Sequence, residues 1–133
     1  MRLRSIALCL VACVKLAGCG SSDYETTESG GYQLRHRVYK DGRGQRAIQI
    51  EYMTKVDIYK NGAVVDALRP AVEAELLRVF DSARPIVQRH AVDVVYLDAQ
   101  YEIEKSAAHR RVRTISAEFR YDAGKWTRIK PQP

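Results

Sequence analysis

The chain has 133 residues, with 22 lysines and arginines against 16 aspartates and glutamates, for a formal net charge of +6. This length suits one small domain built around a single hydrophobic core. All three cysteines, Cys9, Cys13 and Cys19, lie near the N-terminus. The rest of the chain therefore excludes a cysteine nucleophile, a Cys-x-x-Cys redox pair and a zinc site built on cysteine.

The first 18 residues have the pattern of a secretory signal. Arg2 and Arg4 precede an apolar run of nine residues, 6–14. The apolar region of a signal peptide has about 7–15 residues, whereas a membrane-spanning helix needs about 20. The run is therefore short for a stable span and predicts a segment that is exported and removed. An uncleaved N-terminal anchor is the alternative.

The run is followed by Leu16-Ala17-Gly18-Cys19, which resembles the lipobox of bacterial lipoproteins. The resemblance implies that residues 1–18 are a signal peptide and that Cys19 is the first residue of the mature chain. Acyl chains on Cys19 would attach the protein to a membrane. Gly20 stands where an aspartate would resemble an inner-membrane retention signal, which favours the outer membrane, facing the periplasm, if the source is Gram-negative. A signal peptide that is cleaved without lipidation is the alternative.

Removal of the signal would change the charge balance. Arg2, Arg4 and Lys15 leave with it, so 19 basic side chains remain against 16 acidic ones, a net charge of +3. Positive charge is concentrated in residues 105–133, which hold eight basic and two acidic residues. In an envelope protein, such a region predicts contact with an acidic protein surface or an anionic envelope polymer rather than with nucleic acid. A solvated basic surface is the simpler interpretation.

Residues 19–31 are polar, and we interpret them as the lipidated cysteine followed by a flexible tether. Residues 32–133 then form a single small domain. Their periodicity predicts a helix from Asp66 to about Ala83, ended by Pro85, and strands at 32–40, 48–58, 92–104, 110–121 and 125–130. The order β-β-α-β-β-β predicts an α+β fold in which one helix packs on a curved antiparallel sheet of about five strands.

The turn near residues 105–110 allows the pairing of the two long strands to be predicted. If Lys105 lies opposite Arg110, residues of opposite charge face each other, which stabilises a strand pair. The resulting pairs are Glu104 with Arg111, Glu102 with Arg113, Tyr96 with Phe119 and Val94 with Tyr121. This register predicts that the base of the hairpin buries Val92, Val94, Tyr96, Phe119 and Tyr121.

No constellation in the sequence predicts catalysis. None of His36, His90 and His109 has another histidine or a cysteine at metal-ligand spacing. A Gly-x-Ser-x-Gly elbow is absent, and Gly42 and Gly44 precede a predicted strand rather than a phosphate-binding helix. We therefore expect no enzyme activity, no cofactor and no metal.

The candidate binding residues fall into two sets. The first is a possible basic binding face formed by His109, Arg110, Arg120, Lys125, Arg128 and Lys130. The second is a possible apolar contact patch formed by Tyr101, Ile103 and Val112, which the predicted register places together on the other side of the hairpin. These sets favour a membrane-anchored envelope lipoprotein that acts as a non-catalytic accessory or scaffold and binds another envelope component.

A second interpretation comes from residues 119–126. Their sequence, Phe-Arg-Tyr-Asp-Ala-Gly-Lys-Trp, resembles the terminal hairpin of cystatin-like and nuclear-transport-factor-like folds. The resemblance implies a carrier for a small ligand or lipid. Such a carrier needs an apolar cavity between helix and sheet, so a closely packed core at that place would argue against it.

Overall fold

The structure is a computed structural model that describes residues 24–105 and 110–130. Cys19, the signal segment and His109 lie outside the described residues, so the predictions made for them stay predictions. Among the described residues, no helix is both long enough and apolar enough to cross a membrane.

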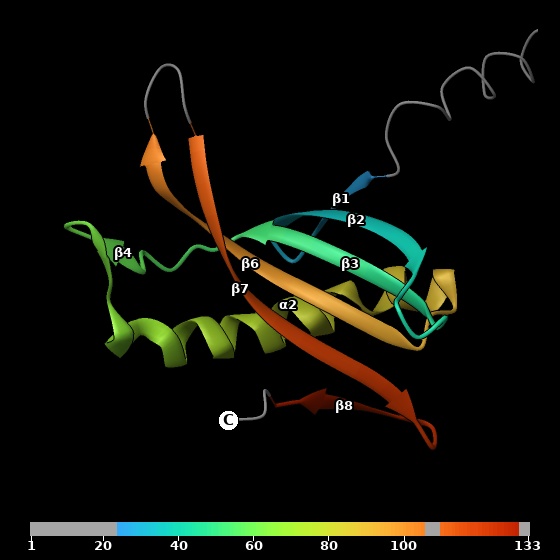
Figure 1. Cartoon of the computed structure of the whole chain (residues 1–133). Helices are drawn as coiled ribbons and strands as arrows, with labels where there is room; N and C mark the ends of the chain where they lie inside the picture. The colour runs from blue at the N-terminus through green and yellow to red at the C-terminus, as the bar shows by residue number, and fades with distance from the viewer. Residues whose placement is uncertain (1–23, 106–109, 131–133) are drawn as a thin grey trace, which may run out of the picture.

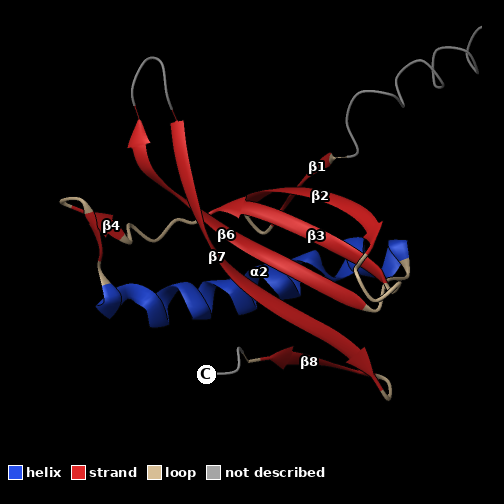
Figure 2. Cartoon of the chain, in the orientation of Figure 1, coloured by secondary structure: helices blue, strands red, loops and turns tan. Residues whose placement is uncertain are grey.

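The described chain forms one main sheet, a small hairpin and one long helix (Figure 1). Its elements are β1 (Glu25–Ser29), β2 (Tyr32–Lys40), β3 (Arg46–Met53), β4 (Tyr59–Lys60), β5 (Ala63–Val64), a 3₁₀ turn (Asp66–Leu68), α2 (Arg69–His90), β6 (Val94–Lys105), β7 (Arg110–Asp122) and β8 (Lys125–Ile129). The main sheet has the strand order β1-β2-β3-β6-β7-β8, and β4 pairs with β5. The helix runs along one face of the sheet (Figure 2). We call the opposite face of the sheet the open face.

The α+β class with one helix packed on a sheet is confirmed, but the sheet is mixed and has six strands. The prediction of a five-stranded antiparallel sheet is therefore wrong. Strands β3 and β6 are neighbours and run parallel, with Ile48 opposite Val95 and Ile50 opposite Leu97. The chain between them contains α2, and a helical crossover of this kind returns the chain to the sheet in the parallel sense.

Strand β1 lies in the segment that we predicted to be a tether. Residues Glu25–Ser29 pair antiparallel with β2, and Ser29 lies opposite Tyr32. The turn between them is Gly30-Gly31, with φ values of 59° and 83°. A tight hairpin needs such positive φ values, which glycine adopts without strain. Because β1 is an edge strand, its polar side chains can stay largely in water.

Helix α2 extends past the residue predicted to end it. Pro85 lies inside the helix, which ends at His90. A proline in a helix interior removes a hydrogen bond and costs about 3 kcal/mol. The extension buries Ile86 and Val87, which are 5% and 2% exposed. Burial of such side chains contributes about 1.5–3 kcal/mol each, which offsets the cost of the proline.

The core lies between α2 and the sheet. Its buried members include Leu34, Ile48, Ile50, Tyr52, Val72, Leu76, Val79, Phe80, Ala83, Val95, Leu97, Ala117 and Phe119. The ring of Phe80 on the helix stacks on Phe119 of β7, with 3.9 Å between centroids and 6° between planes. Trp126 of β8 meets the edge of the same helix ring at 5.7 Å. At this place aromatic rings from α2, β7 and β8 fill the core.

The predicted register of β6 and β7 is confirmed only at the tip of their hairpin. There Lys105 lies opposite Arg110, and the charged pair Glu104 and Arg111 also forms as predicted. A β-bulge between Glu102 and Glu104 then shifts the pairing by one residue. An extra residue in one strand cannot be detected from the alternation of charges alone.

The shift changes which side chains face the core. The predicted pairs Glu102 with Arg113, Tyr96 with Phe119 and Val94 with Tyr121 are wrong, because Glu102 lies opposite Val112, Tyr96 opposite Glu118 and Val94 opposite Arg120. A one-residue shift moves a side chain to the other face of the sheet. Tyr96 is accordingly half-buried on the open face, whereas Val92, Val94 and Phe119 are buried as predicted. Tyr121 lies on the same face of β7 as Phe119, but it is 47% exposed near the end of the strand.

Candidate binding surface

The outer edge of β7 is the largest unpaired stretch of backbone in the main sheet, as far as the described residues show. Strand β7 has 13 residues, but β8 pairs only with its last five, Glu118–Asp122. Residues 110–117 pair with β6 on one side, and the described chain provides no strand on the other side. With the end of β6 they form an arm that projects beyond the rest of the sheet (Figure 1). We call this stretch the β7 edge.

The side chains of the β7 edge are exposed and basic. Arg111, Val112, Arg113 and Thr114 are all exposed. Arg111 makes a 3.7 Å ion pair with Glu104 across the arm. Exposed pairs of this kind contribute only about 0–1 kcal/mol, so Arg111 can exchange its partner at little cost. Within the described residues, no carboxylate lies at ion-pair distance from Arg113.

The predicted apolar contact patch is divided between two places. Tyr101 is 8% exposed, and its ring lies 6.3 Å from that of Tyr59 in β4. Ile103 is partly buried and packs against the core. Val112 is 36% exposed and lies opposite Glu102. Only Val112 is thus available on the surface of the arm, because Tyr101 continues the buried parity of Leu97 and Ala99 in β6.

The predicted basic binding face is also divided. Arg120 lies opposite Thr127 and Phe119 opposite Arg128, so the two arginines point to opposite faces of the sheet. Arg120 pairs with Glu118 on the open face at 2.9 Å, and Arg128 reaches Glu73 of α2 at 3.2 Å.

The remaining members of the predicted basic face are scattered or lie outside the description. Lys125 and Lys130 are exposed at the two ends of β8. Arg110 begins β7, where its backbone alone is described, and His109 lies outside the described residues. The structure therefore does not bring the whole set together at one point.

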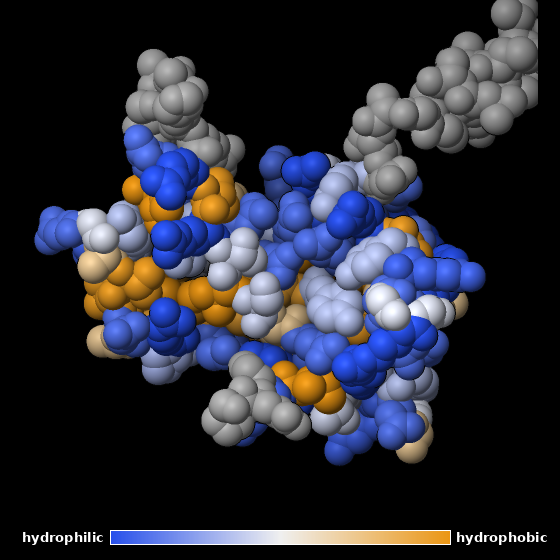
Figure 3. Space-filling view, in the orientation of Figure 1, coloured by the Kyte–Doolittle hydropathy of each residue, from blue (hydrophilic) through white to orange (hydrophobic). Residues whose placement is uncertain are grey.

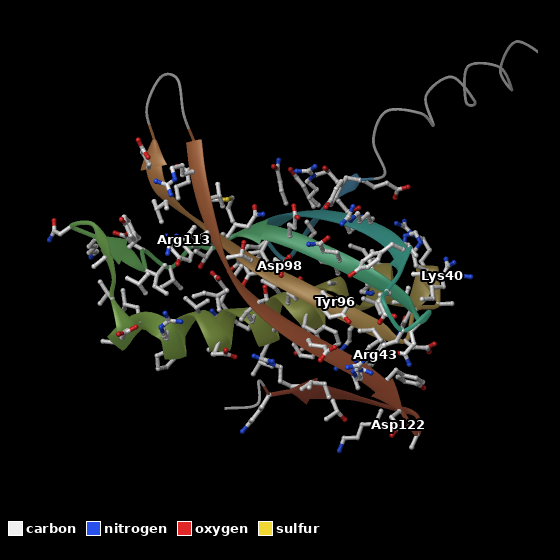
Figure 4. All side chains as sticks on the ribbon, in the orientation of Figure 1. Lys40, Arg43, Tyr96, Asp98, Arg113 and Asp122 are labelled. Atoms are coloured by element: carbon white, nitrogen blue, oxygen red, sulfur yellow. The ribbon has the colours of Figure 1, made fainter. Side chains whose placement is uncertain are left out.

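A groove on the open face collects part of the basic set instead. Its volume is about 510 Å³, and its lining includes Arg43, Tyr96, Glu118, Arg120 and Lys130. Figure 4 shows Arg43 beside Tyr96. Arg128 also lines the groove, which thus has four cationic side chains and one anionic one and suits an acidic ligand more than a basic one.

Arginines and tyrosines form a continuous layer along the open face. The ring of Tyr24 lies 4.0 Å from the guanidinium of Arg35 and 5.0 Å from that of Arg37. Arg37 also lies over Tyr39 at 5.3 Å, and Tyr39 stacks on Tyr96 at 6.4 Å. Partial burial raises the pKa of both Tyr39 and Tyr96, so their hydroxyls stay protonated at neutral pH. Arginine and tyrosine are enriched where proteins bind one another.

Asp98 holds the middle of the open face together. This carboxylate is 9% exposed, and it accepts hydrogen bonds from Ser116 Oγ at 2.7 Å and from Gln49 Nε2 at 2.8 Å. The three residues belong to β6, β7 and β3, so the contacts fix the spacing of three adjacent strands. Figure 4 shows the position of Asp98 in the sheet.

The distribution of apolar side chains on the surface is uneven. Hydrophilic side chains cover much of the surface in Figure 3, and apolar ones gather toward the end where β4 lies.

A second polar network lies under the sheet and was not predicted. Glu75 of α2 is 1% exposed, and its carboxylate accepts four hydrogen bonds. The donors are Tyr32 Oη at 3.0 Å, Tyr52 Oη at 3.1 Å, Thr54 Oγ1 at 2.6 Å and the backbone N–H of Lys55 at 3.0 Å. A carboxylate has about four lone-pair sites, so none is left to accept a proton from a substrate. We interpret Glu75 as a structural residue whose hydrogen bonds hold α2 on the sheet, rather than as a catalytic base.

The sequence contains a signal for Glu75. It lies three residues after Val72 and four before Val79, within the apolar stripe of the helix. A charged residue at a core position of a helix is rarely buried without hydrogen-bonding partners. The partners themselves come from β2, β3 and the segment after β3, and no local pattern identifies them.

The fold also brings together two histidines that are far apart in sequence. His36 of β2 and His90 at the end of α2 have ring centroids 5.8 Å apart, and Glu25 of β1 lies beside them. His36 shares the buried parity of β2 with Leu34, which marks its position in the core but not its neighbour. This cluster is considered separately below.

Comparison with known proteins gives no relative. No protein-family model matches the chain, and neither the curated proteins nor the solved structures include a significant match.

Proposed function

We propose that the chain is a lipid-anchored, non-catalytic protein of the bacterial cell envelope that binds another envelope protein through the β7 edge. The lipobox-like sequence ending at Cys19 supports the anchor. The observation that supports the binding site is the unpaired outer edge of residues 110–117 on a projecting arm. The protein would act as a scaffold or accessory rather than as an enzyme.

The unpaired backbone favours an extended segment as the partner. An exposed strand edge presents a row of backbone donors and acceptors that a strand from another chain can complete. Arg111 and Arg113 discourage neutral or basic strands, because charged side chains on an edge oppose unspecific pairing. They attract a segment that carries aspartate or glutamate. The partner that fits this edge best is therefore an acidic, extended segment of an envelope protein.

The open face of the sheet also supports binding of a partner at the β7 edge. The arginine and tyrosine layer and the groove beside Arg43 lie on the open face, which continues into the arm. A bound partner strand would extend the sheet beyond β7, and its flanking residues could reach this face. The opposite face of the sheet is covered by α2. The stacking of Phe80 on Phe119 shows that this face forms the core and is not available to a partner.

Site-specific photocrosslinking in the living bacterium tests the proposal. A benzoylphenylalanine at Thr114, which is exposed on the β7 edge, should form an adduct with an envelope protein in the full-length chain. The same probe at Leu77, which is 49% exposed on α2, is the control and should form none. Equal adducts at both positions, no adduct at Thr114, or an adduct with a polymer alone would overturn the proposed partner.

A charge reversal tests the acidic character of the partner. Arg113→Glu should reduce the adduct at Thr114 severalfold, because it places like charges opposite each other. The matched variant Lys40→Glu changes an exposed cation at the other end of the sheet and should leave the adduct unchanged. Equal adduct yields for both variants would show that Arg113 does not take part in recognition, which would contradict an acidic partner.

A further inference from the structure

Three potential metal ligands converge at one corner of the domain. Glu25 of edge strand β1, His36 of β2 and His90 at the end of α2 each offer a ligand atom, and these atoms lie within 4.8 Å of one another. Glu25 and His36 are opposite each other in the β1–β2 pair, and His90 arrives from the helix. A pocket of about 230 Å³ that is open to solvent gives access to all three residues.

The ring of His36 has a fixed position in the site. His36 is 1% exposed, lies opposite Glu25 in the β1–β2 pair, and has its ring 5.8 Å from that of His90. A neutral imidazole has one nitrogen with a free electron pair, which is the form that binds metals. Thr27 Oγ1 lies 3.1 Å from His36 Nε2, which leaves Nδ1 as the ligating nitrogen. Metal-bound histidines commonly have such a hydrogen bond at their second nitrogen.

A cationic side chain, Arg89, lies beside the cluster. The guanidinium of Arg89 lies 3.7 Å from the Glu25 carboxylate and 3.4 Å from His90 Nε2. It therefore contacts two of the three potential ligands. The last turn of a helix carries a partial negative charge that favours cations, and the site lies at this end of α2. An Arg89 side chain that is 57% exposed can leave at little cost.

We propose that Glu25, His36 and His90 form a binding site for a zinc ion, which displaces the guanidinium of Arg89. Two imidazole nitrogens and one carboxylate oxygen are a frequent ligand set for Zn²⁺, with water at the fourth position. Tetrahedral ligands at about 2.0–2.1 Å from the metal lie about 3.4 Å apart. The ligands therefore have to approach by at most about 1.4 Å, which the exposed Glu25 on an edge strand permits.

The ion would join the first strand of the domain to the end of its only described helix. Strand β1 is the element nearest to the proposed anchor at Cys19, and it is attached to the sheet through β2 alone. A metal bridge to α2 would hold β1 against the core when force or a partner acts on the N-terminal segment. This inference is independent of the β7 edge, which lies at the opposite side of the sheet.

Zinc titration of the full-length chain in detergent tests the proposal. The chain, without a histidine tag and after treatment with a chelator, should bind one Zn²⁺ measured by competition with a chromophoric chelator. Glu25→Gln and His90→Gln should each weaken binding at least tenfold, and zinc should raise the Tm of the parent chain only. His109→Gln, which removes the third histidine, is the matched control and should bind like the parent.

Arg89→Gln provides a change in the opposite direction. It removes the competing cation and a repulsive charge, so zinc binding should become severalfold tighter. Absence of zinc binding in the parent chain, or equal binding by the parent, Glu25→Gln and His90→Gln, would overturn the site. Weaker binding by Arg89→Gln than by the parent would overturn the displacement of the guanidinium.

Discussion

Replacement of Glu75 by methionine should destabilise the domain strongly, although methionine is apolar and of similar size. The four donors around the carboxylate would lose their acceptor. Tyr32 and Thr54 are only partly buried and can turn toward water, but the backbone N–H of Lys55 cannot turn and Tyr52 is 2% exposed.

The expected cost follows from these two donors. A buried donor left without a partner costs about 1–3 kcal/mol, and removal of one partner from a buried charged network costs about 3–5 kcal/mol. We therefore expect Glu75→Met to lower the free energy of unfolding by about 3–5 kcal/mol. Domains of this size have about 5–15 kcal/mol in total, so the loss is easily measured.

Glu75→Gln separates hydrogen bonding from size. Its amide oxygen can accept from the Lys55 N–H, while its NH₂ group donates to the hydroxyls of Tyr52 and Thr54, which can rotate. Only the added strength of bonds to a charged acceptor is lost, so we expect a cost of about 1–2 kcal/mol. Urea unfolding followed by the fluorescence of Trp126 measures both variants. A methionine variant as stable as the glutamine variant would refute the reasoning.

Two further predictions concern the same core. Burial and the Glu75 carboxylate raise the pKa of Tyr52 above its usual value of about 10. Above pH 10 the tyrosine ionises in the unfolded state before it ionises in the folded state. The contribution of Tyr52 to the free energy of unfolding is therefore complete below pH 10 and falls as pH rises further. Tyr52→Phe should flatten the alkaline fall in unfolding free energy by up to about 1.4 kcal/mol per pH unit. Pro85→Ala should add about 1–3 kcal/mol to the free energy of unfolding, because Asp81 regains a hydrogen-bond donor. Pro70→Ala in the first turn should not, and equal Tm shifts would contradict this.

Local features of the fold could be predicted because their causes are local. The apolar stripe that includes Leu76 and Val79 predicted the helix, and alternation predicted the buried row of Ile48, Ile50 and Tyr52. A tight turn at Ala123-Gly124 joins the strands predicted at 110–121 and 125–130, with φ values of 51° and 76°. In each case a few neighbouring residues determine the conformation.

Features that depend on distant residues could not be predicted. The parallel pairing of β3 and β6 results from the path of α2 across the sheet, and the bulge near Glu102 results from the packing of the arm. Strand β1 was missed because polar composition describes an edge strand and a tether equally well. The helix continues beyond Pro85 because Ile86 and Val87 can be buried, which only the assembled core reveals.

The candidate sites show the same division. The predicted strands at 110–121 and 125–130 already differ in length, but the unpaired β7 edge was not predicted from them. The division of the basic set was not predicted either, because Arg120 and Arg128 lie on opposite faces only once β8 pairs with β7. The approach of His36 and His90, 54 residues apart in sequence, requires the helix to return to the start of the sheet.

The account depends most on Cys19, because the proposed role requires a domain held at a membrane. Intact-mass and N-terminal peptide mass spectrometry of the chain purified from its native membranes tests this directly. We predict a mature chain that starts at Cys19 and carries a diacylglycerol on its sulfur, together with further acylation of its amino group or none. A chain that starts at Met1 or at another residue, with an unmodified Cys19 or without it, would contradict the proposed function.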